Sequence, residues 1–345
     1  MPGRHQFMTN LQQDSITTDG LMEAYPVLRA NSFGSWTANN VASERTFLRK
    51  VVPLIFVAKL IVLASLLGLA GFAVSVTHGL LRIIAQVCLG AVLAHATELI
   101  HQCLHRTATG RASRDQALGM LIATPLGISF WRYLTDHFRH HKDVTKESFS
   151  YNYQRMESKS LPIRITGFLL HLSMLNHFAG TLKWIGFAFA GKVEEKLSET
   201  NPKPNQMVIS RIRRDYLAMA ALLCLAFMVS VTFRTDILIQ LWLIPMIIGW
   251  APIHALIELP EHWRCETFST NPRLNTRSIR ASKLAQWYVN NNCNHVGHHH
   301  DINVAMERLP EHESRLMAQE PFKYFEESYP RFYYRFFRYL LAGKY

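Results

Sequence analysis

The chain has 345 residues, of which 49% are hydrophobic and only 18% are charged, and its formal net charge is +12. Long apolar stretches that alternate with basic segments indicate an integral membrane protein rather than a soluble one. Basic segments beside apolar runs are explained by topology and anionic lipid, so we expect no nucleic-acid binding. Five cysteines without a CxxC pair predict no disulfide framework.

The first 50 residues are polar and predict a cytosolic N-terminal segment without a removable signal peptide. Four apolar runs follow, at about 51–76, 80–100, 216–233 and 237–259. Each run has about 18 residues or more, which is enough to cross a hydrocarbon core of roughly 30 Å as a helix. Short links join the first run to the second and the third to the fourth, so we predict two helical hairpins.

Lysine and arginine are concentrated in the N-terminal, middle and C-terminal segments, whereas the two short links carry almost no net charge. The positive-inside rule therefore places those three segments and both termini in the cytosol. Within the middle segment, the apolar stretch 117–130 is too short to span. The stretch 165–190 contains His171, His177 and Lys183, which favours one or two amphipathic helices on the membrane surface. A further pair of spans is the alternative for this stretch.

The C-terminal segment, residues 311–345, mixes aromatic and basic residues in the sequence FKYFEESYPRFYYRFFRYLLAGKY. Such side chains settle at the headgroup level of a bilayer, so we expect an interfacial anchor. Base stacking on RNA is the less favoured interpretation. We therefore expect a cytosolic segment at 1–50, a membrane domain at 51–310, and a cytosolic basic-aromatic tail at 311–345.

Three groups of histidines follow apolar runs on the predicted cytosolic side. The segments HQCLH, HFRHH and HVGHH contain, in this order, His101 and His105, then His137, His140 and His141, then His295, His298 and His299. Residues three and four apart share one face of a helix, so we expect each group to direct its imidazoles to one point. Because neutral imidazole is the commonest protein metal ligand, this pattern predicts a metal site.

A purification tag, a chance histidine-rich loop and a single zinc site each account poorly for the segment NNNCNHVGHHHD. A tag would not be interrupted by Val296 and Gly297, and a chance loop would not repeat helical spacing in three places. A single zinc takes three or four ligands, and the HExxH pattern of zinc proteases is absent. Eight imidazoles suit two metals with about four ligands each, and ligand type alone leaves iron, zinc and copper open.

The order HxxxH, HxxHH, HxxHH around two pairs of spans resembles the membrane fatty acid desaturase superfamily, which includes hydroxylases and ketolases. RLNTRSIRASKLAQWYVNNNCNHVGHH is similar to the family stretch that leads to the last box. ELPEH resembles the acidic segment that leaves the last span with an additional histidine. The resemblance covers about residues 50–310. With the four spans, it implies an all-α integral membrane fold in which two hairpins carry a cytosolic helical cap with the histidine boxes.

The resemblance also implies two iron ions, molecular oxygen as co-substrate, and electrons from an external donor. Nothing in the sequence resembles a fused cytochrome domain, so we expect a separate donor, either a ferredoxin or a cytochrome b-type protein with its reductase. The expected reaction is the introduction of a C=C bond into an aliphatic chain, fatty acyl or lipid-like. A hydroxylase or ketolase reaction is the alternative, and a non-enzymatic metal-binding membrane protein is the least favoured.

The third box departs from the family pattern, because His300 and Asp301 follow it where the family often has an apolar residue and prolines. Because of this difference, a specialised metabolite is an alternative to a fatty acyl or lipid-like substrate. We expect His300 to be solvated, and the alternative is that it orients one of the metal ligands. The sequence leaves the catalytic side chains open.

The segment HALIELPEH supplies a further candidate. His254, Glu258 and His262 are spaced at i, i+4 and i+8, although Pro260 is expected to interrupt the last turn. We expect His262 to be a ninth ligand, and Glu258 to support it either directly from outside the metal site or through a water. We expect His254 to be a packed or substrate-channel residue. The alternative for His262 is an interfacial histidine beside Trp263.

Metal-bound histidines need a hydrogen-bond partner for the free ring nitrogen, and carboxylates often supply it. Besides Glu258, four acidic residues that flank the boxes are candidates for this role: Glu98, Asp136, Asp143 and Asp301. The alternative for some of them is an ordinary surface carboxylate.

Overall fold

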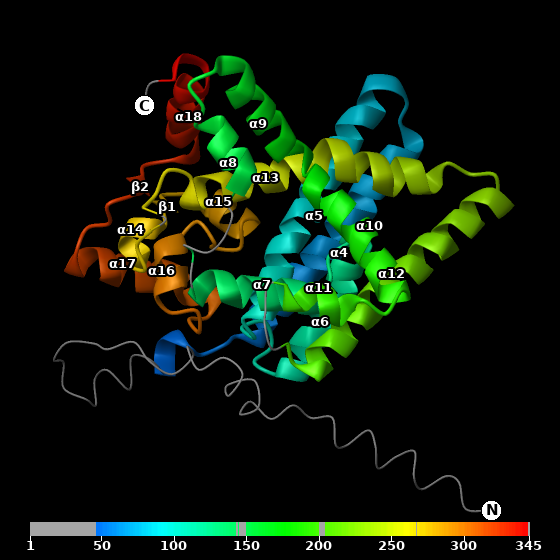
Figure 1. The fold of residues 1–345 in the computed structure, drawn as a ribbon, viewed down its shortest axis with the longest axis horizontal. Coiled ribbons are helices and arrows are strands. Elements are labelled where there is room, and N and C mark those ends of the chain that lie inside the picture. Colours follow the sequence, from blue (N-terminus) through cyan, green and yellow to red (C-terminus); the bar gives the residue numbers. More distant parts are fainter. Residues whose placement is uncertain (1–45, 143, 145–149, 200–203, 267, 344–345) are drawn as a thin grey trace, which may run out of the picture.

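The structure is a computed structural model that describes residues 46–142, 144, 150–199, 204–266 and 268–343. The described part is almost entirely helical, and its one sheet consists of two short strands (Figure 1). An all-α fold is therefore confirmed. Among the predicted site residues, Asp143 lies outside the described residues.

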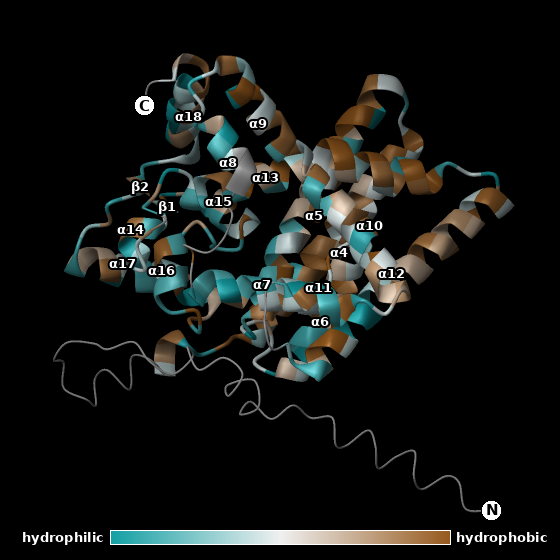
Figure 2. Ribbon diagram, viewed as in Figure 1, coloured by the Kyte–Doolittle hydropathy of each residue, from teal (hydrophilic) through white to brown (hydrophobic). Residues whose placement is uncertain are grey.

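Within the part of the chain that the structure describes, four helical segments are long and apolar enough to cross a membrane. They are α4 (Pro53–Val76), α5 (Gly79–Leu104), α12 (Gln206–Thr232), and a fourth that joins η4 (Ile239–Leu243), η5 (Met246–Trp250) and α13 (Ala251–His262). The number of predicted spans is thus confirmed. The bounds differ, because α5 continues to Leu104 and α12 begins at Gln206. Figure 2 shows hydrophobic residues gathered on these segments and hydrophilic residues around the last third of the chain.

The segments η4 and η5 are π-helical, so the fourth span is not a uniform α-helix. Beside η5 the fourth span comes very close to α5. A Cβ atom built on Gly90 would lie 2.4 Å from the Cα of Gly249, so both positions require glycine. At the next residue of the fourth span, Trp250 Nε1 donates a hydrogen bond of 3.0 Å to Thr97 Oγ1. These contacts fix α5 against α13, and both helices end at the histidines.

The chain between the second and third spans forms α6 (Ala112–Ala123), η2 (Thr124–Leu126), α7 (Phe130–Lys142), α8 (Ser150–Met156), α9 (Leu161–Ser173), α10 (Leu175–Phe189) and α11 (Val193–Ser198). The axis turns by 103° between η2 and α7. Gly127, with φ of 69°, lies at this turn. The stretch 165–190 forms two helices, as expected, and they meet at Met174, where φ is 45°. Each is shorter than a span.

The last third of the chain contains α14 (Pro272–Asn275), β1 (Ser278–Ile279), α15 (Lys283–Tyr288), α16 (His295–His300), η6 (Met306–Arg308), α17 (Leu309–Gln319), β2 (Phe325–Glu326) and α18 (Tyr329–Ala342). Strand β1 pairs with β2 in parallel, so residues from both sides of the third box are joined. In Figure 1, α18 lies beside α8 and α9.

One side of α18 packs inside the protein. Phe332 and Phe336 are fully buried in a cluster with Trp263. Tyr334 and Leu341 are exposed on the same helix. The expected anchoring of this segment at the membrane interface therefore stays a prediction.

Candidate metal centre

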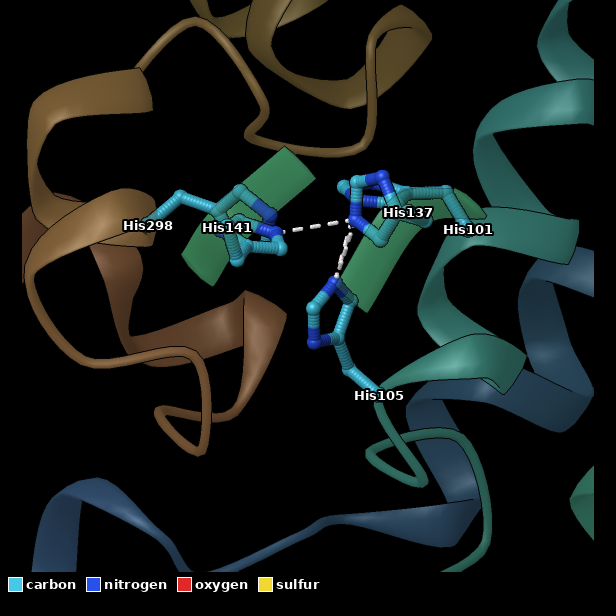
Figure 3. Close-up of side chains that lie close together, drawn as sticks. All are labelled: His101, His105, His137, His141 and His298. Carbon is cyan, nitrogen blue, oxygen red and sulfur yellow. Dashed lines mark hydrogen bonds between the residues drawn. The ribbon is translucent and has the colours of Figure 1, made fainter. Parts of the chain in front are cut away.

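Four helices bring the histidines together. The end of α5 supplies His101 and His105, α7 supplies the second box, α16 supplies the third box, and the last residue of α13 is His262. All nine side chains lie in one of two groups. The first group is His101, His105, His137, His141 and His298, and the second is His140, His262, His295 and His299. In each group the candidate ligand atoms lie within 4.8 Å of one another. Figure 3 shows the first group, in which side chains from three elements point toward one another.

The grouping corrects the expectation that each box aims at one point. His137 and His141 lie in the first group, whereas His140 lies in the second. Likewise His295 and His299 lie in the second group, and His298 lies in the first. Residues at i and i+4 share a helix face, but the residue between them is rotated about 100° away from its neighbour. The HxxHH spacing therefore divides its side chains between two sites.

The ring nitrogens are arranged as ligands around a cation would be. His137 Nε2 lies 2.8 Å from His101 Nε2, 2.8 Å from His105 Nε2 and 2.9 Å from His141 Nε2. A single ring nitrogen cannot form good hydrogen bonds to three others, because a neutral imidazole nitrogen is either one donor or one acceptor. His298 is completely buried, and among the described residues neither of its ring nitrogens has a hydrogen-bond partner. A metal ion would satisfy both observations, so the residues fit metal binding.

Burial lowers the pKa of several of these imidazoles. It lowers the pKa of His105 to about 3. It also holds the pKa of five others well below the usual range, and neighbouring histidines lower it further: His137, His141, His295, His298 and His299. A neutral imidazole has the free lone pair that a metal requires.

Four of the carboxylates proposed to orient the ligands contact other polar residues near the site. The carboxylate Oε1 of Glu258 is 3.2 Å from His254 Nε2. Glu98 Oε1 is 3.9 Å from His254 Nδ1. Asp136 pairs with Arg132 and Arg139, and Asp301 pairs with Arg49. These four carboxylates therefore lie near the histidines, and their role in orienting the metal ligands stays a prediction.

Backbone and amide groups orient two rings of the second group. His262 Nδ1 lies 2.9 Å from the carbonyl oxygen of Asn275, and His295 Nδ1 lies 3.1 Å from Asn292 Oδ1. With Nδ1–H donating to these oxygens, Nε2 of each ring is directed to the centre of the group. Glu261, which was not among the candidates from the sequence, has Oε2 3.4 Å from His295 Nε2.

Two further expectations around the boxes are wrong. Helix α13 contains Pro260 and ends at His262, so the proline does not end the helix before the histidine. His300 is half-buried rather than solvated, and its ring centre lies 5.3 Å from that of His312. His300 belongs to neither histidine group.

Lys59 is a buried cation in the first span and connects it to the third box. Lys59 Nζ donates to Asn290 Oδ1 at 2.6 Å and to Glu307 Oε1 at 3.0 Å. Asn290 has φ of 50°, and its Nδ2 donates to the carbonyl oxygen of Glu98. The turn before the third box is thus tied to α4 and α5. In the sequence, a single lysine within an apolar run was the signal that could have indicated a buried polar contact in the first span.

Three neighbouring cavities approach the histidines from the membrane-spanning part. One of about 210 Å³ has His101, His140 and His262 in its wall. A second, of about 370 Å³, lies between α7, α10 and α13. The third, of about 770 Å³, is lined almost entirely by apolar side chains of α10, α12 and the fourth span. Adjacent cavities share lining residues.

A protein-family model described as fatty acid desaturase matches residues 77–331. The chain belongs to the fatty acid desaturase family. The match includes all nine histidines and starts after the first span. A search of curated proteins found no match. Membership of the fatty acid desaturase family and the two histidine groups indicate an oxidoreductase of the desaturase or hydroxylase type, in a family known for di-iron centres.

Proposed function

We propose that this protein is an oxygen-dependent di-iron desaturase that introduces a C=C bond into the aliphatic chain of a hydrophobic substrate. The observation that carries the proposal is the pair of histidine groups, with five and four imidazoles gathered at one end of the membrane helices. Two clusters of neutral imidazoles suit two iron ions better than one zinc. His262 completes the second group and is the ninth histidine of the site.

Iron is needed because a C–H bond remote from functional groups offers side chains no acid or base handle, so an oxygen-activating cofactor supplies the oxidising power. Removal of two hydrogens consumes one O₂ and two electrons with two protons, and yields two waters. The electrons come from a separate ferredoxin or cytochrome b-type protein with its reductase. The chain's own task is to hold the metals, position one chain carbon and exclude water.

The apolar cavity supports a hydrophobic substrate. Its wall includes Leu222, Trp242 and Met246, on helices that the sequence predicts to be in the bilayer. A chain can therefore enter from lipid without leaving an apolar environment. We place the histidines and both termini in the cytosol, since the flanking segments carry the lysines and arginines.

A hydroxylase or ketolase would use the same groups, and product analysis separates the reactions. Membranes with the enzyme, a reductase system and oxygen-18 gas should give a product that has lost two hydrogens and contains no heavy oxygen. Incorporation of oxygen-18 into the product would show that the enzyme hydroxylates its substrate rather than desaturating it.

The metal assignment is tested by counting iron. We expect about two irons per chain in the purified protein, and His140→Ala should lower iron content and nearly abolish turnover. His300→Ala is the matched control, because His300 is adjacent to the third box but belongs to neither group. Full turnover by His140→Ala would contradict the proposal.

A further inference from the structure

The cavity between α7, α10 and α13 is polar, although it lies between the apolar cavity and the histidines. Its wall contains Arg132, Asp136, His254 and Glu258. It shares Gly127, His177 and Thr181 with the apolar cavity. It shares Tyr133, Asp136, His254 and Glu258 with the cavity at the histidines. A substrate that extends from the apolar cavity to the histidines therefore lies beside these polar side chains.

Glu258 is the most distinctive group in this wall. It is on a membrane-spanning helix, yet its side chain is 43% exposed, and it lines both polar cavities. His254, whose side chain is only 7% exposed, holds Oε1 of this carboxylate at 3.2 Å. Glu98 lies on the other side of the His254 ring, 3.9 Å from Nδ1. The buried ring thus lies between two carboxyl groups, and it contacts the Glu258 carboxylate, which faces the cavity.

The charges of the wall indicate which group of a substrate can bind. Arg132 lies 3.4 Å from Asp136 and also donates to the hydroxyl of Tyr216 at 3.2 Å. Its guanidinium is stacked 4.5 Å from the ring centre of Trp184. The guanidinium of Arg132 is thus already engaged by Asp136, Tyr216 and Trp184, which disfavours an anion as its additional partner. A phosphate or carboxylate would also be repelled by Glu258.

We propose that this polar cavity binds a hydroxyl group of the substrate, which donates its hydrogen bond to Glu258 while His254 holds the carboxylate. The apolar remainder of the molecule occupies the cavity of α10, α12 and the fourth span. This inference rests on the proposed function and narrows its substrate class to chains with a hydroxyl near the carbon that is oxidised. Glu258 is then a specificity-determining residue rather than a partner of His262.

Binding of two matched probes tests the inference without turnover. Hexadecan-1-ol and 1-methoxyhexadecane have the same chain, but only the alcohol can donate a hydrogen bond. Equilibrium binding of each radiolabelled probe to the purified, iron-containing protein is measured in detergent without reductant. A hydrogen bond to a charged acceptor corresponds to roughly tenfold in affinity, so we expect the alcohol to bind about tenfold more tightly than the ether.

Glu258→Leu should bring the ratio of the two affinities close to one, and Glu258→Gln should lower it to roughly threefold, because a neutral amide oxygen is a weaker acceptor. Glu320→Gln, which changes an exposed carboxylate on the surface, is the control and should keep the tenfold ratio. Iron content is measured for every variant. If Glu258→Leu loses iron or fails to fold, Glu258→Gln carries the test, because it keeps the shape of the side chain.

Equal binding of alcohol and ether by the unchanged protein overturns the inference, and so does an unchanged ratio in Glu258→Gln. Failure of the proposed function would look different. Selective binding of the alcohol without oxidation of any chain would support the hydroxyl site and contradict the desaturase function. Oxidation of chains with equal binding of both probes would support the desaturase function and contradict the hydroxyl site.

Discussion

At the residue scale, two adjacent histidines can serve different metals. His140 and His141 are neighbours in sequence, but their rings belong to the second and the first group. The nitrogens His140 Nε2 and His299 Nε2 are 3.1 Å apart, while His141 Nε2 is 2.9 Å from His137 Nε2. The identity of the ligand-type residues and the face that each takes on its own helix were readable from the sequence. Which faces of different helices meet in one group was not, because it depends on how α5, α7, α13 and α16 are rotated against one another.

His262 gives the sharpest prediction for a single ligand. In His262→Ala the second group keeps three imidazoles, so we expect iron content and turnover to fall together. Metal analysis and product formation measure these two quantities. Trp263→Phe is the control, since Trp263 packs against Phe336 and a smaller aromatic ring retains most of that contact. Two irons and normal turnover in His262→Ala would leave a site of eight histidines.

At the element scale, the short helix α16 depends on residues far from it in sequence. The N–H of Val296 donates to Ser278 Oγ at 2.9 Å, and the N–H of Gly297 donates to Glu313 Oε2 at 3.1 Å. The Ser278 hydroxyl in turn donates to Glu313 at 2.8 Å. Strand β1 and helix α17 thus satisfy the first N–H groups of the helix that carries the third box. A helix of six residues has little stability of its own.

Glu313→Ala should destabilise this arrangement. It leaves two buried donors without an acceptor, at about 1–3 kcal/mol each. We expect a lower Tm and a lower iron content. Glu313→Gln should preserve both better, because its amide oxygen still accepts and because burial already raises the pKa of Glu313 to about 7. Glu311→Ala, which removes an exposed pair with Arg315 on the same helix, is the control. A Glu313→Ala protein with normal iron content would contradict this role.

At the scale of the whole molecule, hydropathy predicted the membrane spans, but it could not predict how helices outside the spans pack against them. The four spans follow from their apolar length. The burial of Phe332 and Phe336 could not be predicted from the sequence, because it depends on where α9 and α13 lie. Glu258 is four residues from both His254 and His262, so the spacing alone does not decide which histidine it contacts. The structure places its carboxylate beside His254.

Sidedness is the property of the whole molecule that the proposed function still requires. If the histidines face the cytosol, the segment before α12 must do so too, and the link before η4 must lie on the opposite side. Glu199 and Asp236 are exposed near these two places. In sealed membrane vesicles whose cytosolic face is outward, a membrane-impermeant maleimide should label Glu199→Cys and leave Asp236→Cys unlabelled until the vesicles are opened. The unsubstituted chain, with its five cysteines, sets the background. Labelling of Asp236→Cys but not of Glu199→Cys in sealed vesicles would place the middle segment on the far side, where a cytosolic electron donor cannot reach a histidine site on the same face.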